Sequence, residues 1–416
     1  MSNRASFPKN ILLLTLAGIE DIEQVGIYPD LLRQFRDMGH HVYVVRPIER
    51  RNWGRTELVE KNGAKILKVK TLNITKCNFI EKGISTITIE LTFIRALKRY
   101  FSDVRFDLVL YSTPPITFSG VVKFLKKRDG TTSYLLLKDI FPQNAVDMKL
   151  LKQGGVMYRS FKRKEEELYK VSDYIGCMSP ANCDYLLKHN VLSACKVTLS
   201  PNSIDISKIA QGEINKDELR ERFGIPNNKV IFIYGGNLGI PQGIENLIWL
   251  INKTTDDDCV FFVIAGSGTY YNQLQAVCER KQNVKLFEYL PRAEYDQLVK
   301  CADVGMIFLS QYFEIPNFPS RLLAYQSAKL PVFCITDTAT DIGRIAVKNG
   351  FGYSVELGKR PLTEQLDKQD VIMQLLKEII SHKDQLPAMG EAGYQFMEQN
   401  YSAQKQAEDI ISITSL

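Results

Sequence analysis

The chain reads Val230-Ile231-Phe232-Ile233-Tyr234-Gly235-Gly236-Asn237-Leu238-Gly239-Ile240-Pro241-Gln242-Gly243 ahead of a helical pattern at residues 244–251. Five consecutive apolar residues predict a strand buried on both faces, as in parallel sheets covered by helices. Glycines directly after such a strand let the backbone approach a ligand, and the free N–H groups of the next helix favour a phosphate. The stretch therefore predicts a βα unit with Gly236, Asn237 and Gln242 as candidate binding residues. An ordinary structural loop is the alternative.

The same alternation of short apolar runs and helical stretches covers the whole chain. Strands are predicted at residues 10–16, 41–47, 64–71, 106–112, 132–140, 174–179 and 196–200, and again at 230–234, 259–265, 284–287, 304–309 and 332–335. Such a series predicts an α/β protein of two Rossmann-like, doubly wound domains facing a cleft. We expect a first domain at residues 1–203 and a second at 204–394, with a helix at about 395–416 packing back on the first. A polar stretch at 203–215 marks the junction.

Composition narrows the class of protein. The 416 residues are 45% hydrophobic and 24% charged, which is the usage of a globular chain and excludes collagen-like or wholly disordered proteins. The eight cysteines include no C-x-x-C pair, which argues for reduced thiols. No apolar run approaches 18 residues, and residues 1–9 lack the apolar core of a signal peptide. We therefore expect a cytoplasmic protein.

Charge is unevenly distributed along the chain. Residues 1–200 carry a net charge of +12, whereas residues 201–416 carry −6. Such asymmetry points to an anionic partner for the first half, with basic clusters at 95–99, 123–128 and 162–164. An anionic membrane surface is the favoured partner, and a solvated basic face with no partner is the alternative. Nucleic acid is disfavoured, because these clusters lack interleaved exposed aromatics and no recognition module is visible.

A second candidate motif is Pro319-Ser320-Arg321-Leu322, which follows the predicted strand at 304–309. Ser320 suits the start of a helix, and the N–H groups of Arg321 and Leu322 would point into the cleft. The Arg321 guanidinium could bind a diphosphate with two parallel hydrogen bonds. An ordinary capped helix is the alternative.

Polar residues also follow strands of the first half, at 112–117 and 138–144. Asp139 comes after an apolar run, where a partly desolvated carboxylate could accept a proton or a hydrogen bond from a sugar hydroxyl. A capping or ion-paired aspartate is the alternative. The four histidines form neither a catalytic triad nor a metal site with their neighbours, so we expect no bound metal and no cofactor.

Taken in order, residues 29–42, 112–115, 138–144, 235–243 and 319–325 resemble the GT-B glycosyltransferases of family 4. The resemblance runs over approximately residues 10–401. Four of these segments (112–115, 138–144, 235–243 and 319–325) are closer still to the L-fucosamine-transferase-like branch of bacterial O-antigen and capsule synthesis.

The resemblance implies transfer of a hexosyl or N-acetylhexosaminyl group from a nucleotide-sugar, a UDP-sugar foremost, to a lipid-linked glycan, with retention of configuration and no metal. The donor would lie against the second domain and the acceptor against the first. The enzyme would be peripheral on the inner face of the plasma membrane. The leaving diphosphate itself would take the acceptor proton, so the protein mainly positions groups and stabilises charge.

Site residues follow from the same resemblance. One side of the donor diphosphate would be held by Gly236, Asn237 and Gln242, and the other by Ser320, Arg321 and Leu322. The nucleotide base would be bordered by Tyr289 and Leu290. The acceptor side would include Gly26, Lys138 and Asp139, and we expect Arg321 and Asp139 to be the catalytic pair.

The sequence departs from the family at two positions. Where the family carries two glutamates eight positions apart, this chain has Pro316 and Ala324, and Ala324 cannot hydrogen-bond a ribose. That departure supports an alternative, a catalytically inactive GT-B partner of an active transferase. A nucleotide-sugar epimerase on the same architecture is a further alternative, but it needs several acid and base side chains for which no His or Glu set is found.

Overall fold

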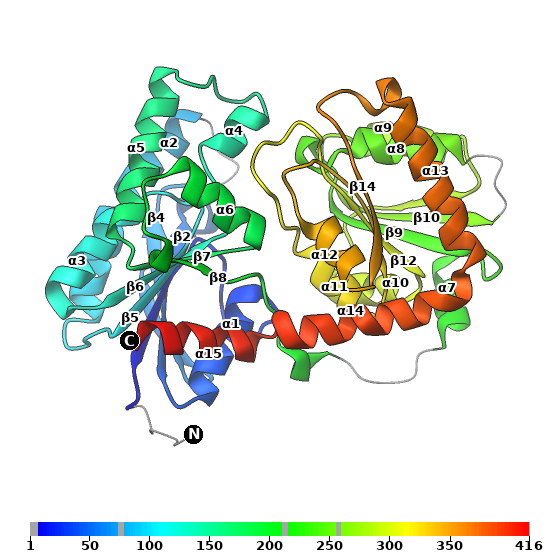
Figure 1. Cartoon of the computed structure of the whole chain (residues 1–416). Coiled ribbons are helices and arrows are strands. Elements are labelled where there is room, and N and C mark those ends of the chain that lie inside the picture. The colour runs from blue at the N-terminus through cyan, green and yellow to red at the C-terminus, as the bar shows by residue number, and fades with distance from the viewer. Residues whose placement is uncertain (1–6, 74–78, 210–214, 255–258, 416) are drawn as a thin grey trace. The chain divides into compact units, whose positions relative to one another are not determined.

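The computed structural model describes residues 7–73, 79–209, 215–254 and 259–415, with the backbone alone for 79–87. It divides into two compact units: unit 1 joins Met1–Asp205 to Ser402–Leu416, and unit 2 is Ile206–Tyr401 (Figure 1). The predicted boundaries at residues 203 and 394 fall two and seven residues before those of the structure. Cys77 and residues 210–214 of the expected junction lie outside the described residues.

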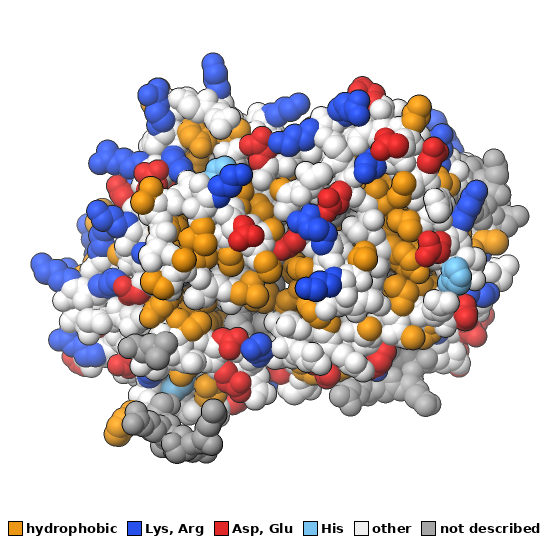
Figure 2. All heavy atoms as spheres, viewed as in Figure 1, with side chains coloured by type: hydrophobic (Ala, Val, Ile, Leu, Met, Phe, Trp, Pro, Cys, Tyr) orange, Lys and Arg blue, Asp and Glu red, His pale blue; other side chains and the backbone are white. Residues whose placement is uncertain are grey.

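Unit 1 is built on an eight-stranded sheet of order β3-β4-β2-β1-β5-β6-β7-β8. All neighbouring strands are parallel except β3, which runs antiparallel to β4. Its strands and helices are β1 (Asn10–Leu14), α1 (Ile27–Asp37), β2 (His41–Glu49), β3 (Glu57–Lys61), β4 (Ala64–Thr71), α2 (Phe79–Tyr100), β5 (Leu108–Ser112), α3 (Ser119–Asp129), β6 (Thr132–Leu137), α4 (Gln143–Asp147), α5 (Val156–Val171), β7 (Tyr174–Cys177), α6 (Pro180–His189), β8 (Val197–Leu199) and α15 (Ala403–Thr414). Of the helices described in either unit, none combines the length and hydropathy of a membrane span. Figure 2 shows Lys and Arg side chains standing out over α3 and α5.

The helix α1 shows how local sequence builds this unit. Pro29 lies in its first turn, where a missing N–H costs nothing, and Gly39 follows its end with φ +88°. Its apolar face, with Leu32 and Phe35, packs into the unit 1 core together with Ile410 of α15. The C-terminal helix thus completes the core of the first unit.

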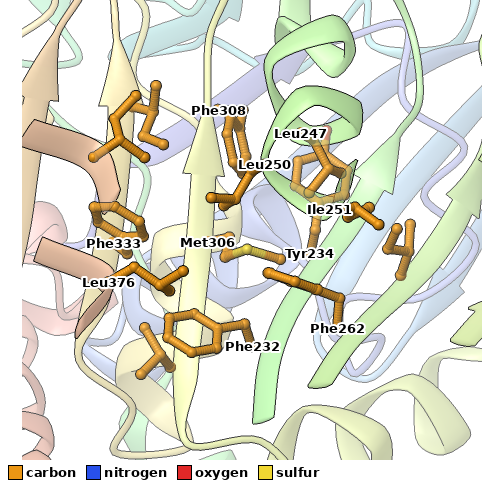
Figure 3. Packing of buried hydrophobic residues seen from close by; sticks show 14 of the residues in the cluster. Phe232, Tyr234, Leu247, Leu250, Ile251, Phe262, Met306, Phe308, Phe333 and Leu376 are labelled. Carbon is orange, nitrogen blue, oxygen red and sulfur yellow. The ribbon is translucent and has the colours of Figure 1, made fainter. Parts of the chain in front are cut away.

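Unit 2 is built on a six-stranded, wholly parallel sheet of order β11-β10-β9-β12-β13-β14. Figure 3 shows its core, where Phe232, Phe262 and Met306 from the strands meet Leu250 and Ile251 from α8. Its elements are α7 (Lys216–Phe223), β9 (Val230–Asn237), α8 (Ile244–Lys253), β10 (Val260–Ser267), α9 (Tyr271–Cys278), β11 (Val284–Phe287), α10 (Arg292–Lys300), β12 (Val304–Phe308), α11 (Arg321–Ser327), β13 (Val332–Thr336), α12 (Ile342–Lys348), β14 (Gly352–Glu356), α13 (Leu366–Ser381) and α14 (Leu386–Asn400).

The chain passes between the units twice, and both passages are fixed to unit 1. Ile204 pairs with Ser402 as an isolated parallel bridge, and the Ala403 N–H donates to the Ile204 carbonyl at 2.9 Å. Arg33, buried in α1, forms ion pairs with Asp30 at 2.7 Å and Asp205 at 3.1 Å. The residues that precede unit 2 and those that follow it are therefore held side by side.

The helix expected at about 395–416 is wrong in its extent. It is two helices: α14 belongs to unit 2 and α15 to unit 1. Ser402 separates them, because its backbone is extended and its hydroxyl accepts the Lys405 N–H at 3.3 Å as the N-cap of α15.

Candidate donor and acceptor sites

The candidate donor site of unit 2 lies where the order of its strands reverses. β9 and β12 are neighbours, but they pair only through Val304 with Phe232 and Gly305 with Ile233. Beyond that point the two strands separate towards their carboxyl ends. Doubly wound sheets bind ligands in the crevice at this reversal. The motif at 235–243 begins in the last residues of β9, and the motif at 319–325 follows β12.

The glycines after Tyr234 belong to the strand, which runs three residues past its predicted end at residue 234. β9 continues to Asn237, because it pairs with β10 as far as Ser267. Gly236 has φ +127°, and a Cβ built on Gly266 of β10 would collide with the Gly236 carbonyl. Both positions therefore need glycine. Gly236 and Asn237 are exposed, so this strand end presents bare backbone.

Arg321 begins α11 and lies directly over that strand end. Its guanidinium carbon is 4.3 Å from the centre of the Tyr234 ring, and its Nη2 hydrogen-bonds to Gln242 Oε1. A Cβ on Gly236 would be 3.5 Å from Nη2. The structure thus brings three predicted residues together: Gly236, Gln242 and Arg321.

Arg321 keeps its positive charge although its side chain is buried. Burial lowers the pKa of Arg321, but the hydroxyls of Tyr234 and Tyr325 act in the opposite direction and the net pKa is raised. Nη1 is buried and has no hydrogen-bond partner among the described residues. Most buried polar groups find a partner, so this donor is available to a group that the protein does not supply.

Tyr325, one helical turn after Arg321, occupies the gap between β9 and β12. Its hydroxyl accepts the Gly235 N–H at 3.2 Å and lies 3.3 Å from the Ile233 carbonyl and 3.2 Å from that of Met306. Its ring lies so close to Gly305 that a Cβ there would collide with it. Because residues four apart share one helix face, Tyr325 fixes the side of α11 that carries Arg321.

The sequence analysis assigns no role to Tyr325, although it is the last residue of the segment 319–325. It missed Tyr295 of α10 as well, whose hydroxyl takes the space beside Gly235, and burial raises the pKa of Tyr295 to about 12. Each tyrosine packs against a glycine that is distant in sequence, Tyr325 against Gly305 and Tyr295 against Gly235. Spacing along the chain does not show such a contact, so no pattern in the sequence points to either residue.

Other predicted donor residues lie less directly in the site. Ser320 is exposed at the N-cap of α11, but its side chain makes no capping bond. The Leu322 N–H donates to the Pro319 carbonyl at 3.3 Å, and the side chain is 1% exposed in the core. The expectation of a free Leu322 N–H is wrong, because the first turn of α11 closes on Pro319.

Tyr289 and Leu290 follow β11, two strands from β9 in the sheet order. At 4.8 Å per strand this separates them from Gly236 by about 10 Å along the carboxyl edge. Tyr289 is 81% exposed and Leu290 is half-buried. Their separation suits the far end of an extended ligand.

In unit 1 the predicted acceptor residues lie at the carboxyl ends of β5 and β6. The Thr113 hydroxyl accepts the N–H groups of Lys138 and Asp139 at 3.0 and 3.1 Å and donates to the Asp139 carbonyl at 2.9 Å. Burial lowers the pKa of Lys138 to about 7, and its Nζ lies 3.4 Å from the Ser200 carbonyl. Asp139 is exposed, yet the surrounding protein desolvates its carboxyl and raises its pKa.

Gly26 lies at the N-cap of α1, and its N–H donates to Asp30 Oδ1 at 3.1 Å. Two residues later, burial raises the pKa of Tyr28; the Ser112 side chain at the end of β5 opposes this rise, and the charge of Asp139 adds to it, so both groups lie near the Tyr28 hydroxyl. The start of α1, with Gly26, is thereby joined to the carboxyl edge that carries Asp139.

The cysteines of the described residues are free thiols.

Residues 215–366, within unit 2, match the family of glycosyl transferases group 1. Among curated relatives, the chain is 23% identical to the probable glycosyltransferase WbjE of Pseudomonas aeruginosa, over 67% of this chain and 69% of WbjE. It is 27% identical to an Escherichia coli UDP-Gal:alpha-D-GlcNAc-diphosphoundecaprenol alpha-1,3-galactosyltransferase, over 49% of this chain but about half (54%) of that enzyme.

Solved structures match over nearly the whole chain. Sucrose-phosphate synthase from Thermosynechococcus elongatus aligns with a TM-score of 0.72 at 13% identity, covering 97% of this chain and 98% of that one. HepE of Anabaena, solved with UDP and glucose, aligns with a TM-score of 0.68 at 14% identity over 98% of this chain and all of HepE. With two parallel-sheet units, this GT-B fold and a group 1 glycosyl transferase domain at 215–366, the chain is a glycosyltransferase of the GT-B type.

Proposed function

We propose that the protein transfers a hexosyl or N-acetylhexosaminyl group from a nucleotide-sugar, a UDP-sugar foremost, to a lipid-linked glycan during surface polysaccharide synthesis. The names of the relatives support the pathway, since one is an α-1,3-galactosyltransferase acting on a diphosphoundecaprenol glycan and another is a putative colanic acid glycosyl transferase of E. coli. The UDP bound in HepE supports the donor class.

The observation that carries the proposal is the Arg321 guanidinium over bare backbone at the strand reversal of unit 2. Held by Tyr234 and Gln242, it keeps Nη1 without a protein partner. A donor diphosphate would accept hydrogen bonds from this fork, which would stabilise the charge that develops on the leaving group. In this proposal Arg321 supplies the positive charge and no metal is required.

On the acceptor side, we assign Asp139 to orient the attacking hydroxyl and Lys138 to hold the strand end beneath it. Transfer with retention would let the leaving diphosphate take the proton, so Asp139 need not be a strong base. Asp139→Asn should then lower turnover while nucleotide affinity stays nearly unchanged. A parallel fall in nucleotide affinity would contradict this division of labour between the units.

One observation favours the inactive partner as a second candidate. Ala324 is half-buried on α11, three residues after Arg321 and next to Tyr325, and its side chain offers no polar atom to a ribose. Calorimetry with UDP, GDP, ADP and dTDP, followed by UDP-sugars, separates the two candidates. Binding of one nucleotide by the wild type, lost in Arg321→Ala, supports the enzyme. Absence of binding for the whole panel supports the inactive partner.

We further propose that unit 1 contacts an anionic membrane from the cytoplasmic side. Ion pairs neutralise part of the charge of two of the three predicted basic clusters: Lys126 pairs with Asp173 at 2.6 Å, and Lys162 with Glu165 at 2.6 Å. Lys123 and Lys127 of α3 form no ion pair among the described residues. Charge reversal of these two lysines should weaken vesicle binding, and binding should fall as salt rises from about 0.1 to about 1 M.

A further inference from the structure

A single exposed tryptophan stands in the turn between β2 and β3. The turn begins as a 3-10 helix, η1 (Arg50–Asn52), and continues through Trp53 to Arg55. Trp53 is 92% exposed, the highest exposure of any described aromatic residue. Tryptophan is highly buried on average in folded proteins, so this exposure is unusual for the residue type.

The backbone of Trp53 strengthens that argument. Its φ of +52° and ψ of 17° place it in the left-handed region, which bulky residues rarely adopt. Gly54, which follows, packs so closely on Ile48 that a Cβ there would push against that side chain. The turn is thus tightly packed from below while the indole is held outward. Neither burial nor backbone preference accounts for a tryptophan here, and such outliers concentrate at functional positions.

The turn also projects from the sheet. The last pair of β1 with β2 joins Leu14 to Val45, but β2 continues for four more residues, paired with β4, to Glu49. At about 3.3 Å per residue, the turn stands about 13 Å beyond the end of β1. It lies at the carboxyl edge, the same edge as Asp139 of the candidate acceptor site.

Charge around the indole is positive. Glu49 pairs with Arg51, and beyond the turn Glu57 pairs with Lys68 at 3.1 Å. Arg50 and Arg55 are exposed and form no ion pair among the described residues. The tip therefore presents an indole between two cations whose charge is not neutralised nearby.

We propose that residues 50–55 form a membrane anchor in which Trp53 enters the headgroup region of an anionic bilayer and Arg50 and Arg55 bind lipid phosphates. An indole combines a flat apolar body with one N–H, which suits the water–lipid interface, and guanidinium groups match phosphate geometry. The anchor would hold the acceptor edge of unit 1 against the leaflet. Its use in catalysis rests on the proposed function, but its binding to lipid is measured without a sugar donor.

The test uses the fact that the chain has two tryptophans, Trp53 and Trp249. In Trp249→Phe, Trp53 alone reports by fluorescence. Vesicles of phosphatidylcholine with phosphatidylglycerol should shift its emission to shorter wavelength, and brominated lipids should quench it. Vesicles of phosphatidylcholine alone should have little effect, because cation–phosphate attraction needs the anionic surface.

Variants quantify the contribution of each side chain. Trp53→Ala should weaken binding to anionic vesicles about tenfold or more, from the apolar area withdrawn from water. Arg50→Gln and Arg55→Gln should each weaken it about fivefold. The matched control is Val191→Ala, which alters an exposed apolar residue after α6, away from the turn, and should leave binding unchanged.

Wild-type vesicle binding with no change in Trp53 emission would overturn the anchor, and so would equal binding by Trp53→Ala. A Trp53 shift that requires an added protein or a soluble glycan, with no response to lipid, would overturn it as well. Transfer to a short soluble acceptor is assayed separately: normal lipid anchoring with no transfer would refute the proposed function and leave the anchor standing.

Discussion

Arg321→Ala is the substitution that most directly tests the candidate donor site. In the structure the guanidinium is held by two protein contacts, the Tyr234 ring at 4.3 Å and Gln242, while Nη1 has no partner among the described residues. Those contacts orient the group, and the unpartnered nitrogen is the part that a diphosphate would use. Removing the side chain therefore removes a preorganised cation rather than a mobile surface charge.

The size of the effect follows from that geometry. Loss of one preorganised donor aimed at developing charge costs about 10²–10³-fold in turnover, or roughly 2–4 kcal/mol. Protein stability should change much less. The lost cation–π contact and hydrogen bond are worth about 1–2 kcal/mol together, and the relief of a buried unpartnered N–H offsets part of this. A melting temperature lowered by several degrees would thus accompany a much larger loss of activity.

The assay compares kcat/KM for transfer with the affinity for UDP and for uridine. If the guanidinium binds the diphosphate, Arg321→Ala should weaken UDP binding and leave uridine binding unchanged. Arg321→Lys keeps the charge but loses the fork, so it should recover only part of the activity. Gln242→Ala should cost less than Arg321→Ala, because neutral hydrogen bonds are weaker than charge-assisted ones.

The reasoning is refuted if Arg321→Ala, folded and with near-normal thermal stability, transfers sugar at the wild-type rate. It is refuted equally if the variant weakens uridine and UDP binding by the same factor, since Arg321 would then act through the nucleoside or through the fold.

Three further outcomes follow from buried groups. Gln326 is fully buried, and neither atom of its amide has a partner among the described residues. Gln326→Leu should therefore raise the free energy of unfolding, measured by urea titration, by about 1–2 kcal/mol. The control Gln365→Leu should lower it, because the Gln365 amide makes several hydrogen bonds. Burial lowers the pKa of His40, so the unfolded chain binds a proton more readily than the folded one. The free energy of unfolding should therefore fall as pH drops from about 7 to about 5. His40→Asn should reduce this pH dependence, and an unchanged dependence would assign it to another group. Tyr325→Phe should raise KM for the donor more than it lowers kcat, and should add little to Arg321→Ala, since it acts through Arg321. Additive losses in the double variant would contradict that coupling.

The central strands were predictable because burial on both faces leaves unbroken apolar runs. β9, β10, β12 and β13 all lie inside the sheet of unit 2, and each begins within one residue of its predicted start. β3 was missed because it is an edge strand whose residues are mostly exposed, so its sequence carries three charges and no apolar alternation. Pairing with β4, rather than its own composition, makes it a strand.

The candidate site was predictable where one residue carries the chemistry. Arg321 is a cation at a helix start, and both features can be recognised from the sequence. The part played by Tyr325 depends on a distant glycine, Gly305, and on the separation of two strands, which no local pattern encodes. The N–H of Leu322 was misjudged for a similar reason, since the first turn of α11 depends on how the preceding loop closes.

The placement of α15 in unit 1 bears on how the chain is made. Unit 2 is one continuous stretch, but the core of unit 1 includes Ala407, Ile410 and Ile411, which are synthesised after all of unit 2. Domains usually fold in the order in which they leave the ribosome. In this chain the face of α1 that packs against α15 stays uncovered until α15 has been synthesised, so unit 2 can reach its native state before unit 1 does. A ribosome stalled before residue 403 would therefore display a folded second unit and an incomplete, protease-sensitive first one.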